Sequence, residues 1–412
     1  MTANLKRARD LMREAGLDAI VAASPVNVRY LGGVHSWLDP LLTEAMVMPG
    51  GSDALAMRAF ALLPAEGEPA LVLNAGLAVN ALAAGAIEDV RLYGRRRIAP
   101  GRPEALSPDL RAIAERVGEA YNSPLHALLA ALRDRGLERG RIGIELRPVA
   151  APSFAGLQDA LPHAWLGDCS SMLGLVRAVK TPQELELLRR SAEIGERAAF
   201  SAFSTLRPGG SLADAVAHFR AAVAADGAAF DHFAAAIGGI SLTTVGDHAF
   251  GAGDCLCVDF GCVYEGYFSD SAATFALGEP PAEALADYAG LLEAVDAGIA
   301  AVTPGVRAGA VQARMAEVIA QHGIVCDPPT GHGLGLEIRD WPILIPDAGA
   351  RITDDCVDVE YDLPLEAGMA INLEISAFRP GLAAVEVERT VVVTEDGRRD
   401  LVPQPREAIF RP

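Results

Sequence analysis

The sequence lacks a run of apolar residues long enough to cross a membrane. A transmembrane helix needs about 18 to 20 such residues, and alanine-rich pieces such as residues 76–87 are shorter than that. The basic residues near the N-terminus are not followed by the continuous apolar stretch of a secretory signal. These absences favour a cytoplasmic location.

Basic residues are scarce. The chain has 35 Lys and Arg residues against 54 Asp and Glu residues and a formal net charge of −19, and no extended cluster of Lys or Arg stands out. Nucleic acids and anionic membrane surfaces are bound through such clusters, so we expect neither as a partner. A small-molecule or peptide substrate is compatible with this charge.

The six cysteines do not form the Cys-x-x-Cys pairs of a structural zinc site. Cys255 and Cys257 fall in an expected strand and face the same side as Asp259, because side chains alternate along a strand. A thiolate ligand is one interpretation of these two cysteines. Small buried thiols that pack as apolar side chains are the simpler one.

The length of 412 residues, of which 51% are hydrophobic, favours two domains. Residues 1–172 alternate helix-like and strand-like segments, which is typical of an α/β domain with a parallel or mixed sheet. Within that domain we expect residues 25–33 to form a turn followed by a strand. Residues 173–412 form the second expected domain, in which helices followed by an acidic hairpin occur twice.

Local signals place the main elements of this second domain. Thr181, Pro182 and Glu184 have the N-cap, first-turn and capping-box pattern that begins a long helix. Residues 254–275 and 368–394 each predict two strands joined by a tight turn.

Each of these hairpins carries a pair of carboxylates inside an apolar strand. Asp259 and Asp270 form the first pair, and Glu374 and Glu388, centred on Gly381, form the second. Folding each hairpin about its midpoint places the two acids opposite each other, with Cβ atoms about 5 Å apart. Like charges at that distance destabilise a hairpin unless a cation lies between them.

His332 lies between the two hairpins in the sequence, in the glycine-rich segment TGHGLGLE. Carboxylate oxygens with one imidazole suit a divalent metal ion, and two carboxylate pairs could hold two ions with some carboxylates bridging. The alternative is that the acids are polar-face residues of two exposed hairpins. The apolar neighbours of Asp259, Glu374 and Glu388 speak against that alternative.

Several segments resemble motifs of the creatinase/prolidase/methionine-aminopeptidase superfamily, whose catalytic domain has the pita-bread fold. The resemblance covers nearly the whole chain and is to the two-domain branch that includes Xaa-Pro dipeptidase, aminopeptidase P and creatinase. The segments are PVNVRYLGG, VKTPQELELLRRSAEI, GDCLCVDFGCVYEGYFSDSAATF, TGHGLGLE, LEAGMAINLE and VEVERTVVVTEDG.

The resemblance implies an α/β N-terminal domain followed by an α+β pita-bread catalytic domain with a pseudo-twofold antiparallel sheet. It also implies a binuclear metallohydrolase that forms a homodimer and holds two divalent ions, often manganese, cobalt, zinc or iron. Glu374 is then a metal ligand and the general base. The full set of implied metal ligands is Asp259, Asp270, His332, Glu374 and Glu388.

The residues around these ligands depart from the family pattern. Arg339 stands where the family has a second histidine; an arginine can bind a carboxylate or an oxyanion but cannot shuttle a proton. Glu386 replaces an arginine, and Ala272 and Ala273 replace a polar pair. We therefore expect hydrolysis of an amide-type C–N bond in a dipeptide-like or small-molecule substrate.

Other candidate residues are proposed from their position in the sequence alone. The family's upstream Pro-His pair is not in place, and the nearest candidate for its histidine is His248, with His232 as another possibility near the substrate. Plain surface or core histidines are the alternative for both. Trp37 is a candidate substrate contact or an ordinary loop residue. Asp340 and Trp341 line the pocket or form a surface turn.

Two further functions remain open at this point. A creatinase-like or ectoine-hydrolase-like amidohydrolase, or a lyase, could use the same scaffold; elimination would incorporate no oxygen from labelled water. A non-catalytic binding module is the other, and the retention of all five implied ligands weighs against it.

Overall fold

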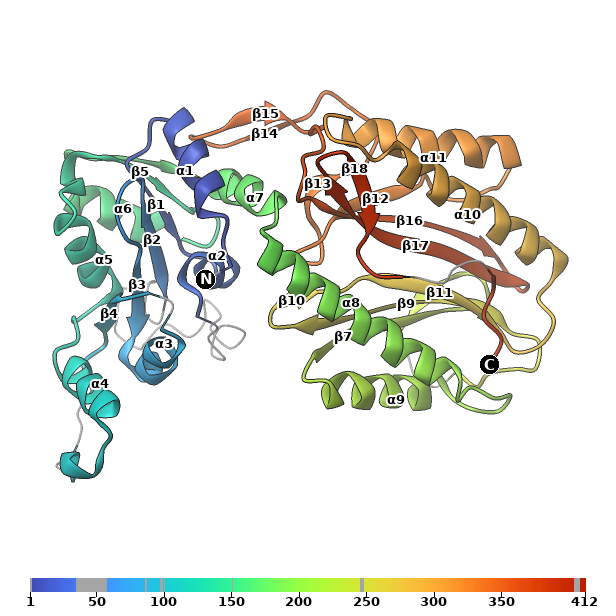
Figure 1. The fold of residues 1–412 in the computed structure, drawn as a ribbon, viewed down its shortest axis with the longest axis horizontal. Coiled ribbons are helices and arrows are strands. Elements are labelled where there is room, and N and C mark those ends of the chain that lie inside the picture. Colours follow the sequence, from blue (N-terminus) through green and yellow to red (C-terminus); the bar gives the residue numbers. More distant parts are fainter. Residues whose placement is uncertain are drawn as a thin grey trace. The chain divides into compact units, whose positions relative to one another are not determined.

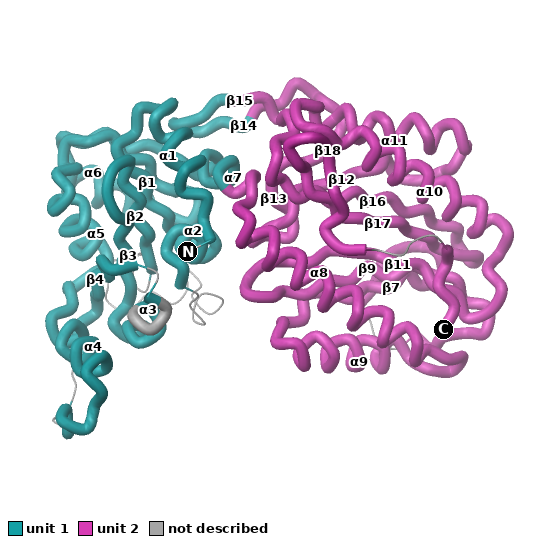
Figure 2. The backbone as a smooth tube through the Cα atoms, in the orientation of Figure 1, with its two compact units in different colours: residues 1–176, 352–358 teal, residues 177–351, 359–412 magenta. Residues whose placement is uncertain are grey.

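The structure is a computed structural model that describes residues 2–34, 58–85, 87–96, 99, 101–149, 151–244, 248–403 and 408–412. The chain divides into two compact units (Figure 2): unit 1 comprises residues 1–176 and 352–358, and unit 2 comprises residues 177–351 and 359–412. The predicted boundary after residue 172 falls inside helix α7 (Ser170–Ala178). No helix within the described ranges is long and apolar enough to cross a membrane.

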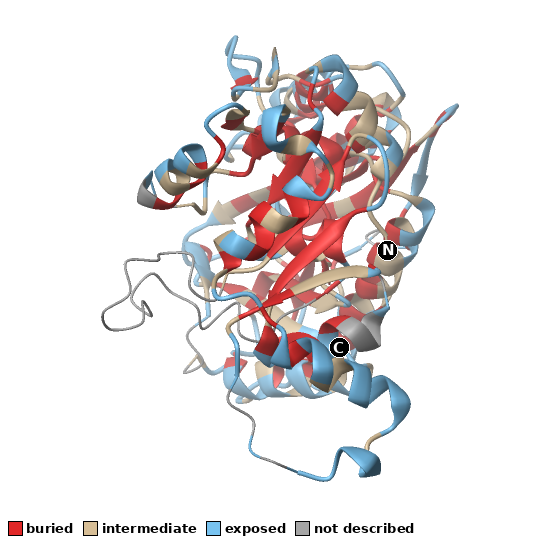
Figure 3. Cartoon of the chain, turned by 90° about the vertical axis from the view of Figure 1, so that its left-hand side faces the viewer, coloured by how far each residue is buried: buried red, intermediate tan, exposed pale blue. Residues whose placement is uncertain are grey.

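Unit 1 is an α/β unit, as its alternating segments predict. Its described residues form a six-stranded mixed sheet in the order β4-β3-β2-β1-β5-β6, in which β1 is parallel to β5 and antiparallel to β2. The strands are largely buried (Figure 3). They are β1 (Ala19–Ala22), β2 (Phe60–Pro64), β3 (Ala70–Asn74), β4 (Asp89–Tyr93), β5 (Arg141–Ile144) and β6 (Trp165–Asp168). The helices, besides α7, are α1 (Leu5–Glu14), α2 (Pro25–Gly32), α3 (Ala78–Ala84), α4 (Pro108–Gly118), α5 (Pro124–Arg133) and α6 (Ala151–Ala160).

Helix α2 corrects the expectation of a turn and a strand at residues 25–33. The hydroxyl of Ser24 accepts a hydrogen bond from the backbone N–H of Asn27, and Pro25 occupies the first turn. Gly33 ends the helix with a positive φ of 69°. These capping signals outweigh the strand preference of the two valines.

A short hairpin within the second half of the chain contributes to unit 1. Its strands are β14 (Arg351–Thr353) and β15 (Asp358–Glu360). Between them, Asp354 Oδ2 accepts hydrogen bonds from the backbone N–H groups of Ser171 (2.8 Å) and Met172 (3.0 Å). N–H groups in the first turn of a helix have no partner inside it, so Asp354 caps α7 from a distant part of the sequence.

Unit 2 is an α+β unit made of two similar halves, and the described residues of each half form two helices and a five-stranded sheet (Figure 1). The first half has α8 (Pro182–Phe203) and α9 (Leu212–Ala225), and the second has α10 (Ala282–Ala301) and α11 (Ala308–His322). The repeat agrees with the internal echo predicted from the sequence. The first sheet has the order β10-β9-β7-β8, with β11 also paired to β9, and the second has the order β13-β12-β16-β17-β18.

The strands of the first sheet are β7 (Ala229–Ile237), β8 (Ser241–Thr243), β9 (Cys255–Tyr264), β10 (Tyr267–Phe268) and β11 (Ser271–Ala276). Those of the second are β12 (Thr330–Gly333), β13 (Asp340–Ile343), β16 (Ala370–Arg379), β17 (Ala383–Thr394) and β18 (Gly397–Asp400). The two sheets meet at β11 and β17, where the Thr274 hydroxyl accepts a hydrogen bond from the Glu386 backbone N–H (2.9 Å).

Two apolar cores fix the helices to the two sheets. Under α8 and α9 the core is rich in phenylalanine, and the rings of Phe203 and Phe260 lie 6.0 Å apart in an edge-to-face arrangement. Under α10 and α11 it is mainly aliphatic and includes Val295, Met315 and Leu373. The sheets are thereby held between helices, and the polar side chains of the site occupy the region where β11 and β17 meet.

Helix α8 begins at the predicted capping box. Thr181 Oγ1 accepts a hydrogen bond from the Glu184 backbone N–H (3.2 Å), and Glu184 Oε2 accepts one from the Thr181 backbone N–H (2.8 Å). The other oxygen of Glu184 accepts a hydrogen bond from the Tyr267 hydroxyl (3.3 Å). Burial raises the pKa of this carboxyl from an ordinary value of 4.5 to about 7.

We expect Glu184→Gln to flatten the pH dependence of stability. The folded protein keeps the Glu184 proton that the unfolded chain releases, so this group's contribution is present below about pH 4.5 and is lost as the pH rises through about 7. Glutamine retains the capping geometry but does not titrate. Urea unfolding at pH 5 and pH 8 measures the difference. Glu186→Gln, which changes an exposed acid of the same helix, is the control and should keep the wild-type difference.

Candidate metal centre

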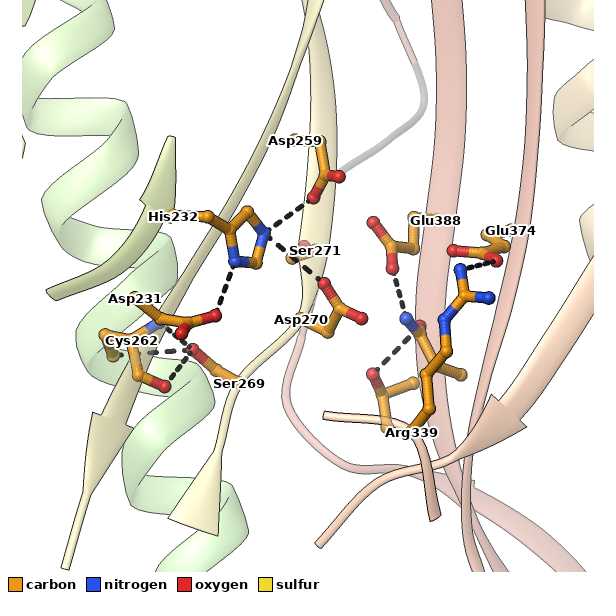
Figure 4. A network of polar contacts seen from close by, with 12 residues as sticks. Asp231, His232, Asp259, Cys262, Ser269, Asp270, Ser271, Arg339, Glu374 and Glu388 are labelled. Carbon is orange, nitrogen blue, oxygen red and sulfur yellow. Dashed lines mark hydrogen bonds and ion pairs between the residues drawn. The ribbon is translucent and has the colours of Figure 1, made fainter. Parts of the chain in front are cut away.

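Five acidic and imidazole side chains from both halves of unit 2 converge where β11 and β17 meet, and most of them are drawn in Figure 4. Two come from the first half and three from the second. They are Asp259 in β9, Asp270 just before β11, His332 in β12, Glu374 in β16 and Glu388 in β17. The structure therefore brings together the five residues that the sequence proposes as metal ligands.

The second hairpin has the predicted register. Glu374 of β16 pairs directly with Glu388 of β17, because the hairpin folds about Gly381. Neutral side chains hold the two acids: Thr330 Oγ1 donates a hydrogen bond to Glu374 Oε1 (2.8 Å), and the Asn372 amide donates one to Glu388. The amide oxygen of Asn372 in turn accepts a hydrogen bond from the neighbouring hydroxyl of Thr390 (3.2 Å).

The first hairpin corrects the predicted register. Asp259 pairs with Ala272, not with Asp270. The turn consists of Glu265 and Gly266, both with positive φ (47° and 80°), so its centre lies one residue beyond the midpoint used in the prediction. A shift of one residue in the centre moves the partner by two residues, which keeps the same face. Asp270 therefore still points toward the acid of β9, along a diagonal.

His332 is buried with a ligand-like arrangement of its two nitrogens. Nδ1 lies 3.0 Å from the backbone oxygen of Gly333, which favours a proton on Nδ1 and a lone pair on Nε2. Nε2 lies 3.3 Å from Asp270 Oδ2 and 3.9 Å from Glu374 Oε2 and has no hydrogen-bond partner among the described residues. The glycines beside it are needed for close packing, since a Cβ on Gly333 would lie 2.1 Å from the backbone oxygen of Trp341.

The electrostatics of these residues fit a divalent cation. Glu388 is 2% exposed, and burial together with the charges of Asp270 and Asp259 raises the pKa of its carboxyl well above the ordinary value. Several buried carboxylates around an unpartnered imidazole nitrogen form a hard oxygen donor set with one nitrogen. A bound cation would offset their mutual repulsion and satisfy that nitrogen.

Glu386 is a residue of the site that sequence reasoning noted only as the replacement of an arginine. It is 8% exposed, and its Oε2 has no hydrogen-bond partner within the described part of the chain. Burial, and then the charge of Asp259, raise its pKa well above the ordinary value. The alternation of side chains along β17 could have predicted this, because it places Glu386 on the same face as Glu388.

Arg339 and Asp340 are neighbours in sequence with opposite environments. The Arg339 side chain is 67% exposed, and its Nη2 lies 3.4 Å from Glu374 Oε1, so the guanidinium is at the edge of the centre. Asp340 is buried and pairs with Arg177 (3.1 Å) and Lys180 (3.7 Å). This corrects the expectation that Asp340 lines the substrate pocket: its carboxylate is neutralised in the interior and anchors the segment that presents Arg339.

The remaining candidates have other surroundings. Trp341 packs edge-to-face against Tyr361 with ring centroids 4.8 Å apart. His248 Nε2 lies 3.1 Å from the carboxylate of Asp254, at the start of β9. A strand rises about 3.4 Å per residue, so Asp254 is about 17 Å along the chain from Asp259; this placement does not support a catalytic role for His248. Trp37 lies outside the described residues.

His232, expected near the substrate, lies against the aspartates of the first hairpin. Its Nε2 is 2.8 Å from Asp259 Oδ1 and 3.5 Å from Asp270 Oδ1, and its Nδ1 is 2.7 Å from Asp231 Oδ2. The position of His232 in the sequence could not reveal this, because the contact depends on how β7 pairs with β9.

Both parts of the chain match known protein families. Residues 186–395 match the model of metallopeptidase family M24, and residues 4–179 match that of the creatinase/prolidase N-terminal domain. The chain is 30% identical over 289 residues to a probable dipeptidase PepE of Mycobacterium bovis (64% of this chain, 71% of that protein). It is 29% identical over 242 residues to an Xaa-Pro dipeptidase of Pyrococcus furiosus (57% of this chain, 66% of that protein). The solved structure of an Xaa-Pro dipeptidase from Bacillus anthracis superposes with a TM-score of 0.72 at 21% identity, covering 98% of each chain.

We expect Asn372→Ala to weaken metal binding without unfolding the protein. The substitution removes the amide that orients Glu388, and loss of such an outer partner typically costs about 10- to 100-fold in metal affinity. Titration calorimetry with Mn²⁺ measures the change. Thr394→Ala, at the exposed end of the neighbouring strand β17, is the matched control. Equal affinities in both variants would contradict the positioning role of Asn372.

Proposed function

Because the chain belongs to metallopeptidase family M24, we propose that it is a metal-dependent dipeptidase that hydrolyses the amide bond of a dipeptide. The observation that carries the proposal is the buried Nε2 of His332, which has no hydrogen-bond partner in the described chain and faces Asp270 and Glu374. Such a nitrogen among carboxylates is suited to binding a metal ion.

Membership of the family implies divalent metal ions. We propose two ions, chosen from manganese, cobalt, zinc and iron. When bound, such ions polarise the carbonyl of the scissile bond and lower the pKa of a water molecule that attacks it. The residues that would hold them are Asp259, Asp270, His332, Glu374 and Glu388.

Glu374 is the proposed general base. Its Oε1 accepts hydrogen bonds from Thr330 and Arg339, which orients the carboxylate, and its Oε2 lies on the side of His332. The side chain is 20% exposed, so a substrate and a water molecule can reach it. The carboxylate takes a proton from the attacking water and delivers it to the leaving nitrogen.

Arg339 is the proposed anchor for the substrate's C-terminal carboxylate. A guanidinium binds a carboxylate through two parallel hydrogen bonds, and the Arg339 side chain combines exposure with a contact to Glu374. It carries a permanent charge and does not transfer protons, so proton transfer falls to Glu374.

The relatives favour a peptide substrate. They are named as dipeptidases and Xaa-Pro dipeptidases. These names favour a dipeptide over the small non-peptide amide that the altered residues also suggested, and over the elimination reaction that the same scaffold could support. The homodimer and the cytoplasmic location remain predictions. Size-exclusion chromatography with light scattering tests the first.

We expect the purified protein to contain about two divalent ions per chain and to hydrolyse dipeptides, including Xaa-Pro dipeptides, with loss of activity on chelation. Glu374→Gln should lower kcat by about 10²- to 10⁴-fold, because general base catalysis contributes that much. Metal content by elemental analysis, measured in parallel, separates loss of the base from loss of the ions.

Glu395→Gln, which changes an exposed acid just after β17, is the control for this experiment and should retain wild-type kcat. A metal-loaded wild-type protein that leaves every dipeptide intact would contradict the proposed substrate class.

We expect Arg339→Ala to raise KM about tenfold or more for a dipeptide with a free C-terminal carboxylate, since hydrogen bonds between charged groups contribute about 1.5–3 kcal/mol. The KM for the matching dipeptide amide should change little. Arg339→Lys keeps the charge without the paired hydrogen bonds, so its KM for the acid should lie between those of wild type and Arg339→Ala. An equal loss on the acid and the amide would contradict the anchoring role.

A further inference from the structure

Strand β7 brings a second imidazole to the metal centre. His232 Nε2 lies 2.8 Å from Asp259 Oδ1 and 3.5 Å from Asp270 Oδ1. We infer that His232 is a sixth protein ligand, which binds a divalent ion through Nε2 together with these two aspartates. The inference rests on the proposed metal-dependent function and extends the ligand set beyond the five residues that the family resemblance implies.

The separations of the three ligand atoms fit one coordination sphere. Ligands bound at right angles about 2.1 Å from an ion lie about 3 Å apart. One nitrogen of His232 and one oxygen from each of Asp259 and Asp270 all lie within 4.8 Å of one another. A single ion can therefore contact all three after small side-chain rotations.

Asp231 completes the arrangement that metal-binding histidines usually have. Its Oδ2 lies 2.7 Å from His232 Nδ1, on the opposite side of the ring from Asp259 and Asp270 (Figure 4). A carboxylate that accepts the Nδ1 proton fixes the tautomer, leaves the Nε2 lone pair for the ion and makes the imidazole a stronger ligand. His332 has the same arrangement, with the Gly333 backbone oxygen in place of the carboxylate.

The backbone around His232 is built to admit its ring. The register between β7 and β9 shifts between Phe230 and His232, which leaves Asp231 unpaired in the ladder and brings His232 opposite Gly261. A Cβ on Gly261 would lie 2.5 Å from His232 Cε1, so a residue with a side chain there would displace the ring.

Asp270 lies between the two imidazoles. Its Oδ1 is 3.5 Å from His232 Nε2, and its Oδ2 is 3.3 Å from His332 Nε2. Each oxygen of one carboxylate thus faces a different histidine. With metal bound, His232 would hold one of the two proposed ions and His332 the other, and Asp270 would offer an oxygen on each side.

The test uses the full-length protein loaded with cobalt(II) and proton NMR. A coordinated imidazole that keeps its Nδ1 proton gives a strongly shifted resonance that exchanges with solvent. Wild type should show two such resonances, one for each histidine. His232→Gln should lose one, His332→Gln should lose the other, and His248→Gln, outside the centre, should keep both. Calorimetry should show cobalt binding weakened at least tenfold in His232→Gln.

The outcomes separate the inference from the function on which it rests. Cobalt bound by wild type, with a spectrum that His232→Gln leaves unchanged, overturns the role of His232 while the metal-dependent function stands. A wild-type protein that binds no cobalt overturns both.

Asp231→Asn provides a second test should His232→Gln fail to fold. It retains the ligand but weakens the acceptor of the Nδ1 proton, so the His232 resonance should broaden through faster exchange. A resonance that keeps its position and width in Asp231→Asn counts against the inference.

Discussion

Repulsion among buried carboxylates is the constraint on which the centre of unit 2 depends. Glu388, Glu386 and Asp270 each lie almost out of reach of water, and burying a single unpaired charge costs several kcal/mol. The two apolar cores supply the compensation, because they fix both sheets whether or not the acids are neutralised. The scaffold can therefore hold mutually repelling groups in place for a cation.

Neutral and cationic side chains around the acids complete this arrangement. Thr330 and Asn372 donate hydrogen bonds to glutamates without adding charge, so the negative potential at the centre is preserved while the carboxylates are oriented. Permanent positive charge lies at the exposed edge of the centre, in Arg339, or further away, where Arg177 and Lys180 neutralise Asp340. A cation placed among the ligands themselves would compete with the metal.

Local signals predicted what depends on neighbouring residues in the sequence. The capping box of α8 and the Glu374–Glu388 register follow from short-range chemistry and were found from the sequence. The residue opposite Asp259 lies two positions beyond Asp270, because the hairpin turns at Glu265 and Gly266, which the spacing alone does not show. The strand predicted within residues 25–33 is wrong: the segment forms a helix, because its capping signals outweigh the strand preference of its valines.

The partners of His232 and Asp340 could not be predicted from local sequence. The first depends on a register shift between β7 and β9, and the second on cations more than 150 positions away. Both are tertiary facts that no spacing rule contains. The same kind of long-range dependence governs unit 1, where Asp354 caps helix α7. A fragment that ends at residue 176 would lack that cap, so unit 1 cannot be excised whole by a single cut.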